Sequence, residues 1–307
     1  MKCNENYLLN NGVRIPVIGF GTFPIPNGED AYNAVSLALK AGYRLIDTAF
    51  IYGNEESVGK AVRDSGIDRK EVFIISKSNP EVNTFEETLE SFEKTNKNIG
   101  LGYIDLYLIH SPRSTIKTGN DLLKENLDIW RGMEEIYTSG RCHAIGVSNF
   151  KIPDLIAIRE NCKIPPMANE IKFFIGNTQD ELLKFCQNNE IIVIGYTPLA
   201  RGHLLKNEKI GTIAQKYNKT NSQICIRYVV QKGVIPVPKS SHSKYIMQNA
   251  EIDFEIDKED MGFLDSLKIT VDFKQNSSGT KKAINNLKRL IRSIIGSRIY
   301  YRLKYRN

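Results

Sequence analysis

Cysteine is scarce in this sequence of 307 residues, which contains five of them. The cysteines are scattered, with no C-x-x-C motif and no two at the spacing of metal ligands. A disulfide scaffold and a cysteine-based zinc site are therefore excluded, and we expect reduced thiols, a cytoplasmic location and no bound metal. The five residues are Cys3, Cys142, Cys162, Cys186 and Cys225.

Long hydrophobic runs are also missing. No apolar stretch approaches the roughly 18–20 residues needed to cross a bilayer. Residues 1–6 are polar and offer no apolar core of a signal peptide. We therefore expect neither a secreted nor an integral membrane protein.

Acidic residues are absent from the last 28 positions. Residues 280–307 contain nine Lys or Arg and no Asp or Glu, whereas residues 1–279 contain 33 basic and 35 acidic side chains. The net charge of +7 therefore belongs to the C-terminal segment. Because the rest of the chain is nearly neutral, we expect no nucleic-acid partner.

Short β-branched runs alternate about eight times with amphipathic stretches of helical length. Runs such as residues 104–109 are almost entirely apolar, which favours parallel strands covered on both faces. Eight such units in about 250 residues predict an α/β fold, the (β/α)8 or TIM barrel. The predicted strands are 17–20, 45–47, 71–77, 103–109, 144–148, 167–171, 191–196 and 234–237. The predicted helices are 29–41, 55–65, 84–98, 122–139, 153–160, 179–188, 210–217, 222–231 and 243–249.

The first predicted strand is not followed by a G-x-G-x-x-G motif, which argues against a Rossmann cofactor site. Ahead of that strand, residues 8–15 predict an N-terminal β-hairpin. Asn11-Gly12 suits a type I′ turn, which needs a positive φ at both positions. Such a hairpin would close the bottom of the barrel.

Polar side chains stand at the C-terminal ends of nearly all predicted strands. In a barrel these ends surround the active-site mouth. Each residue has an ordinary explanation by itself, as a turn cap, a solvated charge or a structural hydrogen bond, but together they predict one site. They are Asp47 with Tyr52 five residues later, Lys77, His110, Ser148, Asn149, Asn169, Glu170, Tyr196, Lys239, Ser240 and Ser241.

The segments that carry these residues resemble the aldo-keto reductase family. The resemblance covers about residues 7–268 and implies a barrel that reduces an aldehyde or ketone with NAD(P)H. The similar segments are GYRLIDTA (42–49) continuing to YGNEE (52–56), LYLIHSP (106–112), GVSNF (146–150), YTPLARG (196–202) and GVIPVPKS (233–240).

The resemblance implies four catalytic residues, and their chemistry agrees with it. Carbonyl reduction needs an acid that protonates the developing alkoxide, which would be Tyr52. A phenol has a pKa near ~10, and a neighbouring Lys77 ammonium would lower that value. Asp47 would hold Lys77 in place, and His110 would donate a hydrogen bond to the substrate carbonyl.

The resemblance also implies how a nicotinamide is held. Ser148 and Asn149 would bind its carboxamide and Tyr196 would stack on its ring. Glu170 stands where the family usually has Gln; its carboxylate still accepts hydrogen bonds and would favour the oxidised, cationic ring. Further implied cofactor contacts are Gly21, Thr22, Asp47, Thr197, Leu199 and Ser241.

The adenosine end departs further from the family pattern. Lys239 and Ser240 match the grip on a 2′-phosphate, but Tyr245 aligns with the usual Arg and Gln248 with the usual Glu, while Asn249 is retained. Tyr245 could still stack on the adenine ring, but it cannot make the bidentate phosphate contact that an Arg would make. We expect NADPH through Lys239, with NADH as the alternative.

The implied substrate pocket contains Phe23, Tyr52, His110 and Ser111. Ser111 stands in place of a common aromatic residue, Phe23 in place of a frequent Trp, and Phe174 in place of a frequent His. With fewer large aromatic side chains, the pocket should accept small carbonyl compounds such as short aldehydes, α-dicarbonyls or sugars.

We divide the chain into a barrel over residues 1–272 and a linker with a basic amphipathic helical tail over residues 273–307. Two hypotheses stand for the tail, contact with an anionic membrane surface or packing on protein. A rival function is a nicotinamide-binding sensor or scaffold docked through the tail, and another is an alcohol dehydrogenase working in the oxidative direction. We expect a monomer or a weak dimer.

Overall fold

The computed structural model describes residues 5–112 and 120–271. The chain divides into two units, residues 1–268 and 269–307, and of the second unit only residues 269–271 are described. The expected linker and basic tail, residues 273–307, lie outside the described residues. The boundary after residue 272 therefore stays a prediction.

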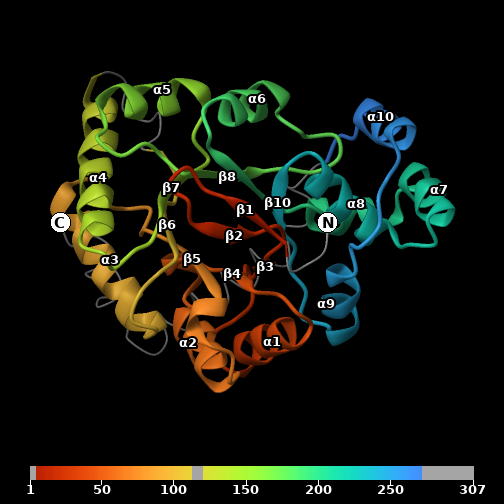
Figure 1. Ribbon diagram of the computed structural model, residues 1–307, viewed down its shortest axis with the longest axis horizontal. Coiled ribbons are helices and arrows are strands. Elements are labelled where there is room, and N and C mark those ends of the chain that lie inside the picture. The colour runs from red at the N-terminus through yellow and green to blue at the C-terminus, as the bar shows by residue number, and fades with distance from the viewer. Residues whose placement is uncertain (1–4, 113–119, 272–307) are drawn as a thin grey trace, which may run out of the picture. The chain divides into compact units, whose positions relative to one another are not determined.

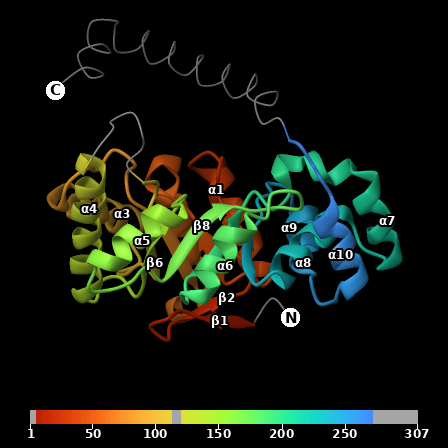
Figure 2. The ribbon, with the colours of Figure 1, turned by 90° about the horizontal axis from the view of Figure 1, so that it is seen from above.

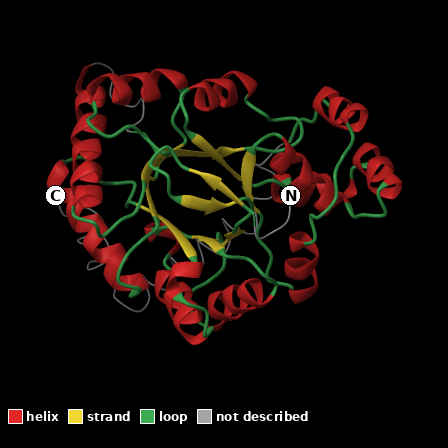
Figure 3. Cartoon of the chain, in the orientation of Figure 1, coloured by secondary structure: helices red, strands yellow, loops and turns green. Residues whose placement is uncertain are grey.

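Eight parallel strands form the centre of the first unit and pair with one another in chain order (Figures 1 and 3). The Gly19 backbone N–H donates to the Pro236 carbonyl (2.9 Å) and that of Gly21 to the Pro238 carbonyl (3.0 Å), so the first and last strands also meet. This arrangement confirms the predicted (β/α)8 barrel. The strands are β3 (Phe20–Gly21), β4 (Leu45–Asp47), β5 (Phe73–Lys77), β6 (Leu106–Ile109), β7 (Ile145–Ser148), β8 (Ala168–Lys172), β9 (Ile192–Tyr196) and β10 (Val234–Val237).

The meeting of β3 and β10 depends on a residue without a side chain. A Cβ atom at Gly21 would lie 2.8 Å from the carbonyl oxygen of Val237, closer than packed atoms tolerate. Glycine at this position therefore permits the backbone contact that closes the barrel.

Helices surround the strands, as predicted from the alternating pattern (Figure 1). One helix of the structure, α10, was not predicted, because only Asp260 and Leu264 of its nine residues are buried and the apolar periodicity is weak. The helices are α1 (Glu29–Lys40), α2 (Glu55–Asp64), α3 (Phe85–Ile99), α4 (Asn120–Thr138), α5 (Ile152–Asn161), α6 (Asp180–Asn188), α7 (Glu208–Lys216), α8 (Asn221–Gln231), α9 (Ser243–Ala250) and α10 (Lys258–Ser266). Three short 3-10 helices accompany them, η1 (Phe50–Tyr52), η2 (Arg69–Glu71) and η3 (Ala200–Lys206).

The predicted hairpin is present as the antiparallel strands β1 (Asn6–Leu8) and β2 (Arg14–Pro16). The expected type I′ turn is wrong. Of residues 10–12, only Gly12 has a positive φ (83°). The Leu9 N–H donates to the Val13 carbonyl (2.9 Å), so the loop contains three residues. Such a loop needs one left-handed residue, whereas a type I′ turn needs two.

The hairpin lies across the bottom of the barrel (Figure 2). The Tyr7 hydroxyl donates to the Val230 carbonyl (3.3 Å), and the Asn11 side-chain amide donates to the His143 carbonyl (2.9 Å), two residues before β7 begins. Ile15 is completely buried. These contacts place the hairpin at the N-terminal ends of the strands, opposite the mouth that carries the candidate site.

Candidate active site

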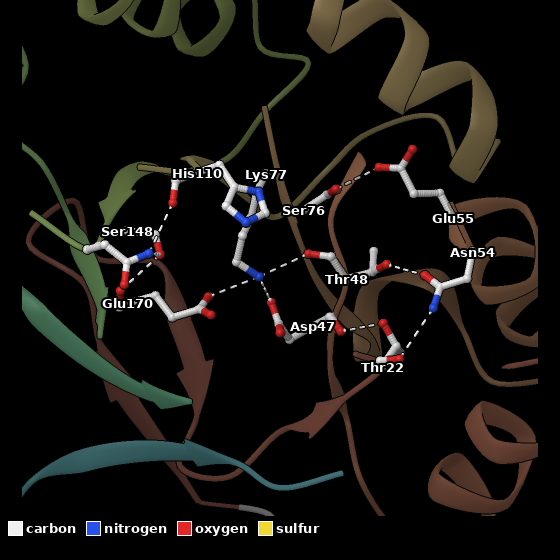
Figure 4. Close-up of polar contacts among 11 residues, drawn as sticks. Thr22, Asp47, Thr48, Asn54, Glu55, Ser76, Lys77, His110, Ser148 and Glu170 are labelled. Atoms are coloured by element: carbon white, nitrogen blue, oxygen red, sulfur yellow. Dashed lines mark hydrogen bonds and ion pairs between the residues drawn. The ribbon is translucent and has the colours of Figure 1, made fainter. Parts of the chain in front are cut away.

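A buried lysine lies at the centre of the predicted site, at the end of β5. The Lys77 ammonium forms an ion pair with Asp47, at the end of the neighbouring β4, and donates to the Thr48 carbonyl (3.0 Å). It also lies 3.1 Å from a carboxylate oxygen of Glu170, on β8 (Figure 4). Lys77 is 1% exposed, Glu170 2% and Asp47 3%. The structure thus brings together three ionisable groups from three strands.

Burial and mutual attraction set the charges of this group. Burial acts to lower the pKa of Lys77, but the charges of Asp47 and Glu170 raise it by more than burial lowers it. The pKa therefore lies above its usual value. Burial raises the pKa of Asp47 in spite of the nearby ammonium. Burial and the Asp47 charge raise the pKa of Glu170 to about 8, with Lys77 acting in the opposite direction. The lysine is therefore a permanent cation.

Tyr52 ends η1, the short helix that follows β4. Gly53 comes next in a left-handed conformation (φ 66°), which ends the turn and returns the chain to α2. The Lys77 ammonium lies 5.3 Å from the centre of the Tyr52 ring, and the His110 ring stands perpendicular to it with centres 6.0 Å apart. The four predicted catalytic residues therefore lie together.

The expectation that Lys77 brings the pKa of Tyr52 below its ordinary value is wrong in this structure. Burial raises the pKa and outweighs the lowering by Lys77, while the Asp47 and Glu170 carboxyls raise it further. The Tyr52 phenolate is still more stable beside Lys77 than it would be in the same site without the lysine. Its effect is to limit the cost of burial, since a buried phenolate without a cation would be less stable.

His110 follows β6 and is half-buried. Burial and the Lys77 charge lower its pKa to about 4, so the imidazole is neutral near pH 7. Its Nδ1 atom is buried and has no hydrogen-bond partner among the described residues. The Asn149 side-chain amide donates to the His110 backbone carbonyl (3.2 Å) and joins this segment to β7.

Ser148, Asn149 and Tyr196 form one hydrogen-bonded chain across the ends of β7, β8 and β9. The Ser148 hydroxyl donates to the Glu170 backbone carbonyl (3.0 Å), and the Asn149 amide donates to the Ser148 oxygen (2.9 Å). The Tyr196 hydroxyl donates to the Asn149 side-chain oxygen (2.7 Å). Asn149 has a left-handed backbone (φ 63°), a conformation that favours Asn over most side chains. Three of the predicted nicotinamide contacts are thus adjacent.

Several residues of the segment after β9 have a positive φ. Thr197 (φ 55°), Ala200 (φ 46°) and Arg201 (φ 55°) are all left-handed, and Gly202 follows with φ 91°. Left-handed backbone is unfavourable for residues such as Thr and is often found at functional sites. The Thr197 hydroxyl oxygen is buried without a hydrogen-bond partner among the described residues. Leu199, also predicted here, is half-buried.

The predicted adenosine site lies between β10 and the first turns of α9. Lys239 and Ser241 are exposed, and the Ser240 hydroxyl oxygen accepts from the His242 backbone N–H (3.1 Å). Tyr245 is 51% exposed and meets the His242 ring edge-on. Helix α9 contains no arginine.

The two remaining predicted adenosine residues differ in their surroundings. Gln248 is half-buried. Asn249 is buried, and its side-chain oxygen accepts a hydrogen bond from Ser222 (2.6 Å) on α8. That contact gives Asn249 a structural function, joining α8 to α9.

The predicted substrate-pocket residues are accessible to different degrees. Phe23 is 52% exposed, and its ring lies 4.9 Å from that of Tyr52, centre to centre. Ser111 is half-exposed. Phe174, by contrast, is 3% exposed, so its side chain belongs to the core and presents little surface to a substrate.

Sequence reasoning missed the polar contacts that support the loop between β4 and α2. Asn54 is fully buried; its side-chain oxygen accepts from the Thr48 hydroxyl (2.7 Å) and its amide donates to the Thr22 carbonyl (3.3 Å) (Figure 4). The amide also donates to the Ile25 carbonyl (2.9 Å). The Thr22 hydroxyl donates to the Asp47 backbone carbonyl (3.0 Å), so its side chain is committed inside the protein. The segment 52–56 that carries the resemblance includes Asn54, but no spacing rule revealed its partners.

No group of three or more His, Cys, Asp or Glu side chains among residues 5–112 and 120–271 could hold a metal ion. Within the same ranges, no helix is both long and apolar enough to cross a membrane.

Comparisons with known sequences and with solved structures agree on one family. Residues 17–269 match the model of the aldo/keto reductase family. Glyoxal reductase of Bacillus subtilis (strain 168) is 43% identical over 260 residues, which cover 84% of this chain and 91% of that protein. The 9,11-endoperoxide prostaglandin H2 reductase of Trypanosoma cruzi (strain CL Brener) is 39% identical over 272 residues, which cover 87% of this chain and 93% of that protein. Among solved structures, an aldo-keto reductase of Bombyx mori in complex with NADP has a TM-score of 0.80 at 30% identity, covering 91% of this chain and 98% of that chain.

Proposed function

The chain belongs to the aldo/keto reductase family, and we propose that it reduces a small aldehyde or ketone to an alcohol with NADPH, with Tyr52 as the general acid. One observation carries the proposal. The Lys77 ammonium is paired with Asp47 beneath the Tyr52 ring, and the neutral His110 ring stands against the same tyrosine. This arrangement supplies a phenol, a cation near it and a neutral hydrogen-bond donor within one buried site.

The residues around the mouth fit a nicotinamide nucleotide. The buried Thr197 hydroxyl and His110 Nδ1 have no hydrogen-bond partner among the described residues, and a polar ligand would satisfy them. Ser148, Asn149, Glu170 and Tyr196 would hold the nicotinamide, which supplies the hydride when it is bound. Thr197 and Leu199 on the following segment, Gly21 at the end of β3 and the backbone of Thr22 after it are further proposed contacts.

At the opposite end of the cofactor, exposed Lys239 lies close in sequence to the N-terminus of α9. A helix N-terminus and a lysine together attract phosphate. Ser240, Ser241 and Tyr245 would complete the adenosine site, with Gln248 and Asn249 behind them on α9. We therefore propose NADPH as the preferred cofactor; without an arginine in α9, NADH is the alternative.

Tyr52 would act through its hydroxyl proton. The O–H bond of Tyr52 breaks as the proton passes to the alkoxide oxygen of the reduced substrate, and the phenolate later regains a proton from water. Lys77 stabilises the phenolate by charge, and Asp47 fixes the position of Lys77. The buried ion pair therefore supports the proton transfer that completes reduction.

His110 would orient the substrate. Its depressed pKa of about 4 keeps the ring neutral, so the ring offers one N–H donor and adds no positive charge beside Lys77. A hydrogen bond from this N–H to the substrate carbonyl oxygen polarises the carbonyl and aligns it with Tyr52.

The substrate we propose is small. Phe23 is the large exposed aromatic side chain of the predicted pocket residues, and Ser111 beside His110 is short. These features support short aldehydes, α-dicarbonyls or sugars. The relatives described above are named for chemically different substrates, so their names support the reaction class more than any single compound.

The test is to follow the absorbance of NADPH with a panel of small aldehydes and dicarbonyls, in both directions. We expect turnover that Tyr52→Phe reduces by about 10²–10⁴-fold while cofactor binding is retained. Turnover that survives in Tyr52→Phe would contradict the acid assignment. Cofactor binding without any turnover in the parent chain would favour the sensor or scaffold instead.

For location and partners we propose a cytoplasmic monomer or weak dimer, with the basic tail contacting an anionic membrane surface or a protein. The charge distribution supports this proposal, because residues 280–307 contain nine basic and no acidic side chains. The test is sedimentation with phosphatidylserine vesicles, using the full chain and a chain that ends at residue 274. Loss of sedimentation in the shorter chain supports membrane contact, and absence of sedimentation by the full chain eliminates it.

A further inference from the structure

Two carboxyl groups share one ammonium group inside the barrel mouth. Lys77 forms an ion pair with Asp47, and its Nζ atom lies 3.1 Å from the Oε2 atom of Glu170. All three side chains are buried. If both carboxyls were ionised, the cluster would carry a net charge of −1 with almost no water to solvate it, which is unfavourable. One proton shared by the carboxyls removes that charge.

The contacts place this proton on Glu170 rather than on Asp47. Asp47 has the closer contact with the ammonium, whereas the Oε2 atom of Glu170 lies 3.1 Å from it. Burial and the Asp47 charge raise the pKa of Glu170 to about 8, against the opposing effect of Lys77. Glu170 is therefore the member of the cluster whose charge changes near neutral pH.

The Lys77 cation beside Glu170 does not change charge in that range. Lys77 on β5 is held as an ammonium, since the attraction of Asp47 and Glu170 outweighs the lowering of its pKa by burial. Lys172, two residues further along β8, is half-buried and shares the strand with Glu170. Lys77 therefore stands as a fixed charge beside the titrating pair.

The remaining titratable neighbours stay neutral. Burial raises the pKa of Tyr52 on η1 and that of Tyr196 on β9, and the Glu170 charge raises both further. Burial and Lys77 lower the pKa of His110 to about 4. Between pH 6 and 9, the Asp47–Glu170 pair is therefore the group in this site that gains or loses a proton.

We propose that Glu170 couples cofactor binding to a proton, standing as a neutral carboxylic acid beside a reduced nicotinamide and as a carboxylate beside an oxidised, positively charged one. The inference rests on the proposed function, because it requires the nicotinamide to bind beside Glu170. When the oxidised form binds, the O–H bond of Glu170 breaks and the proton leaves to solvent; no other bond changes. Glu170 thereby selects the oxidation state of the cofactor according to pH.

The direction of the effect follows from linkage. A nearby cation lowers the pKa of a carboxyl by about 1–3 units, so binding of NADP⁺ releases a proton and strengthens as pH rises. The rise ends near pH 8, where Glu170 of the free protein is itself ionised. The neutral ring of NADPH lacks this attraction. The 2′-phosphate is common to both forms, and its titration cancels in the ratio of the two dissociation constants.

The experiment measures Kd for NADP⁺ and NADPH by calorimetry with the full chain at pH 6, 7, 8 and 9. We expect the ratio of Kd for NADPH to Kd for NADP⁺ to rise about tenfold between pH 6 and 8. Glu170→Gln keeps the shape and hydrogen-bonding groups of the side chain, and it should flatten this dependence. Glu55→Gln is the control: Glu55 is another buried carboxyl, hydrogen-bonded by Ser76 (2.7 Å) and Asn98 (3.0 Å), and its removal should leave the dependence intact.

Proton release by the unaltered protein gives a second readout that does not depend on how any variant folds. Titration at pH 7.5 in two buffers of different ionisation enthalpy should show more protons released by NADP⁺ than by NADPH. Equal release, or the same pH dependence in the unaltered chain and in Glu170→Gln, overturns the proposal for Glu170 and leaves the reductase function standing. Failure to bind either cofactor overturns both.

Discussion

Lys77 and Glu170 come from β5 and β8, which are not neighbours in the sheet, yet the Lys77 Nζ and Glu170 Oε2 atoms lie 3.1 Å apart. Strands that are far apart along an open sheet become close across a closed barrel, because side chains that point inward meet near its axis. The site therefore contains one cation between two carboxyls, Asp47 from the adjacent strand and Glu170 from across the barrel.

Removal of the lysine should destabilise the protein strongly. Lys77→Met leaves Asp47 and Glu170 buried together without a cation, and breaking a buried ion pair on one side costs about 3–5 kcal/mol. Urea unfolding at pH 7 measures the loss in the free energy of unfolding. Adding Glu170→Gln to Lys77→Met should recover part of it, and a double variant no more stable than the single one would show that the carboxyls do not repel each other there.

The stability cost of Glu170 should grow with pH. Its pKa is raised to about 8 in the folded protein, above the ~4.3 of an unfolded chain, so the folded state binds the extra proton. Stability associated with this group is complete below pH 4 and is lost as pH rises to about 8. The free energy of unfolding of Glu170→Gln should therefore exceed that of the parent by a margin that widens by at most about 1.4 kcal/mol per pH unit between pH 5 and 8. A constant margin would contradict the raised pKa.

The ionisation of His110 should not affect the rate of the reaction near neutral pH. Its pKa of about 4 means that the ring is already neutral at pH 5 and remains so at higher pH. The profile of kcat/KM against pH should therefore lack a limb between pH 5 and 7. Replacement by Ala should lower kcat/KM by about 10²-fold through loss of the carbonyl hydrogen bond, whatever the pH. A limb near pH 6.5 that disappears in the variant would show that the imidazole is charged in that range.

Cofactor preference should depend on one exposed lysine. Lys239→Ala should weaken NADPH binding by about tenfold and leave NADH binding nearly unchanged, because only NADPH has a 2′-phosphate to lose that contact. Tyr245→Arg should do the opposite and strengthen NADPH binding. Lys258→Ala provides the control, an exposed lysine on α10 outside the predicted cofactor site. Equal weakening of both cofactors by Lys239→Ala would contradict a phosphate contact.

Much of the barrel could be predicted from the sequence, because buried parallel strands have an almost continuous apolar composition. The bounds of β4 (Leu45–Asp47) and β10 (Val234–Val237) agree with the prediction. The first strand is shorter than predicted, since the Val17 N–H pairs with the Glu5 carbonyl (3.1 Å) of the hairpin instead of with the barrel. Local pattern identifies an extended segment but not the partner to which its backbone bonds.

In the candidate site too, local features could be predicted from the sequence, whereas contacts across the barrel could not. The strand-end position of Asp47 and Lys77 is visible in the sequence, and their pairing follows from adjacent strands. The contact of Lys77 with Glu170 is not visible, because it depends on the width of the closed barrel. The raised pKa of Tyr52 was missed for a related reason, since burial is a property of the assembled fold.

The closure at Gly21 has a consequence for how this protein is made. The backbone contacts that join the first strand to the last need Pro236 and Pro238, which emerge from the ribosome long after Asp47 and Lys77. Until those residues are synthesised, the barrel lacks the contacts that close it around the two charges. The Asp47–Lys77 ion pair therefore acquires its buried surroundings late, although both residues are synthesised early.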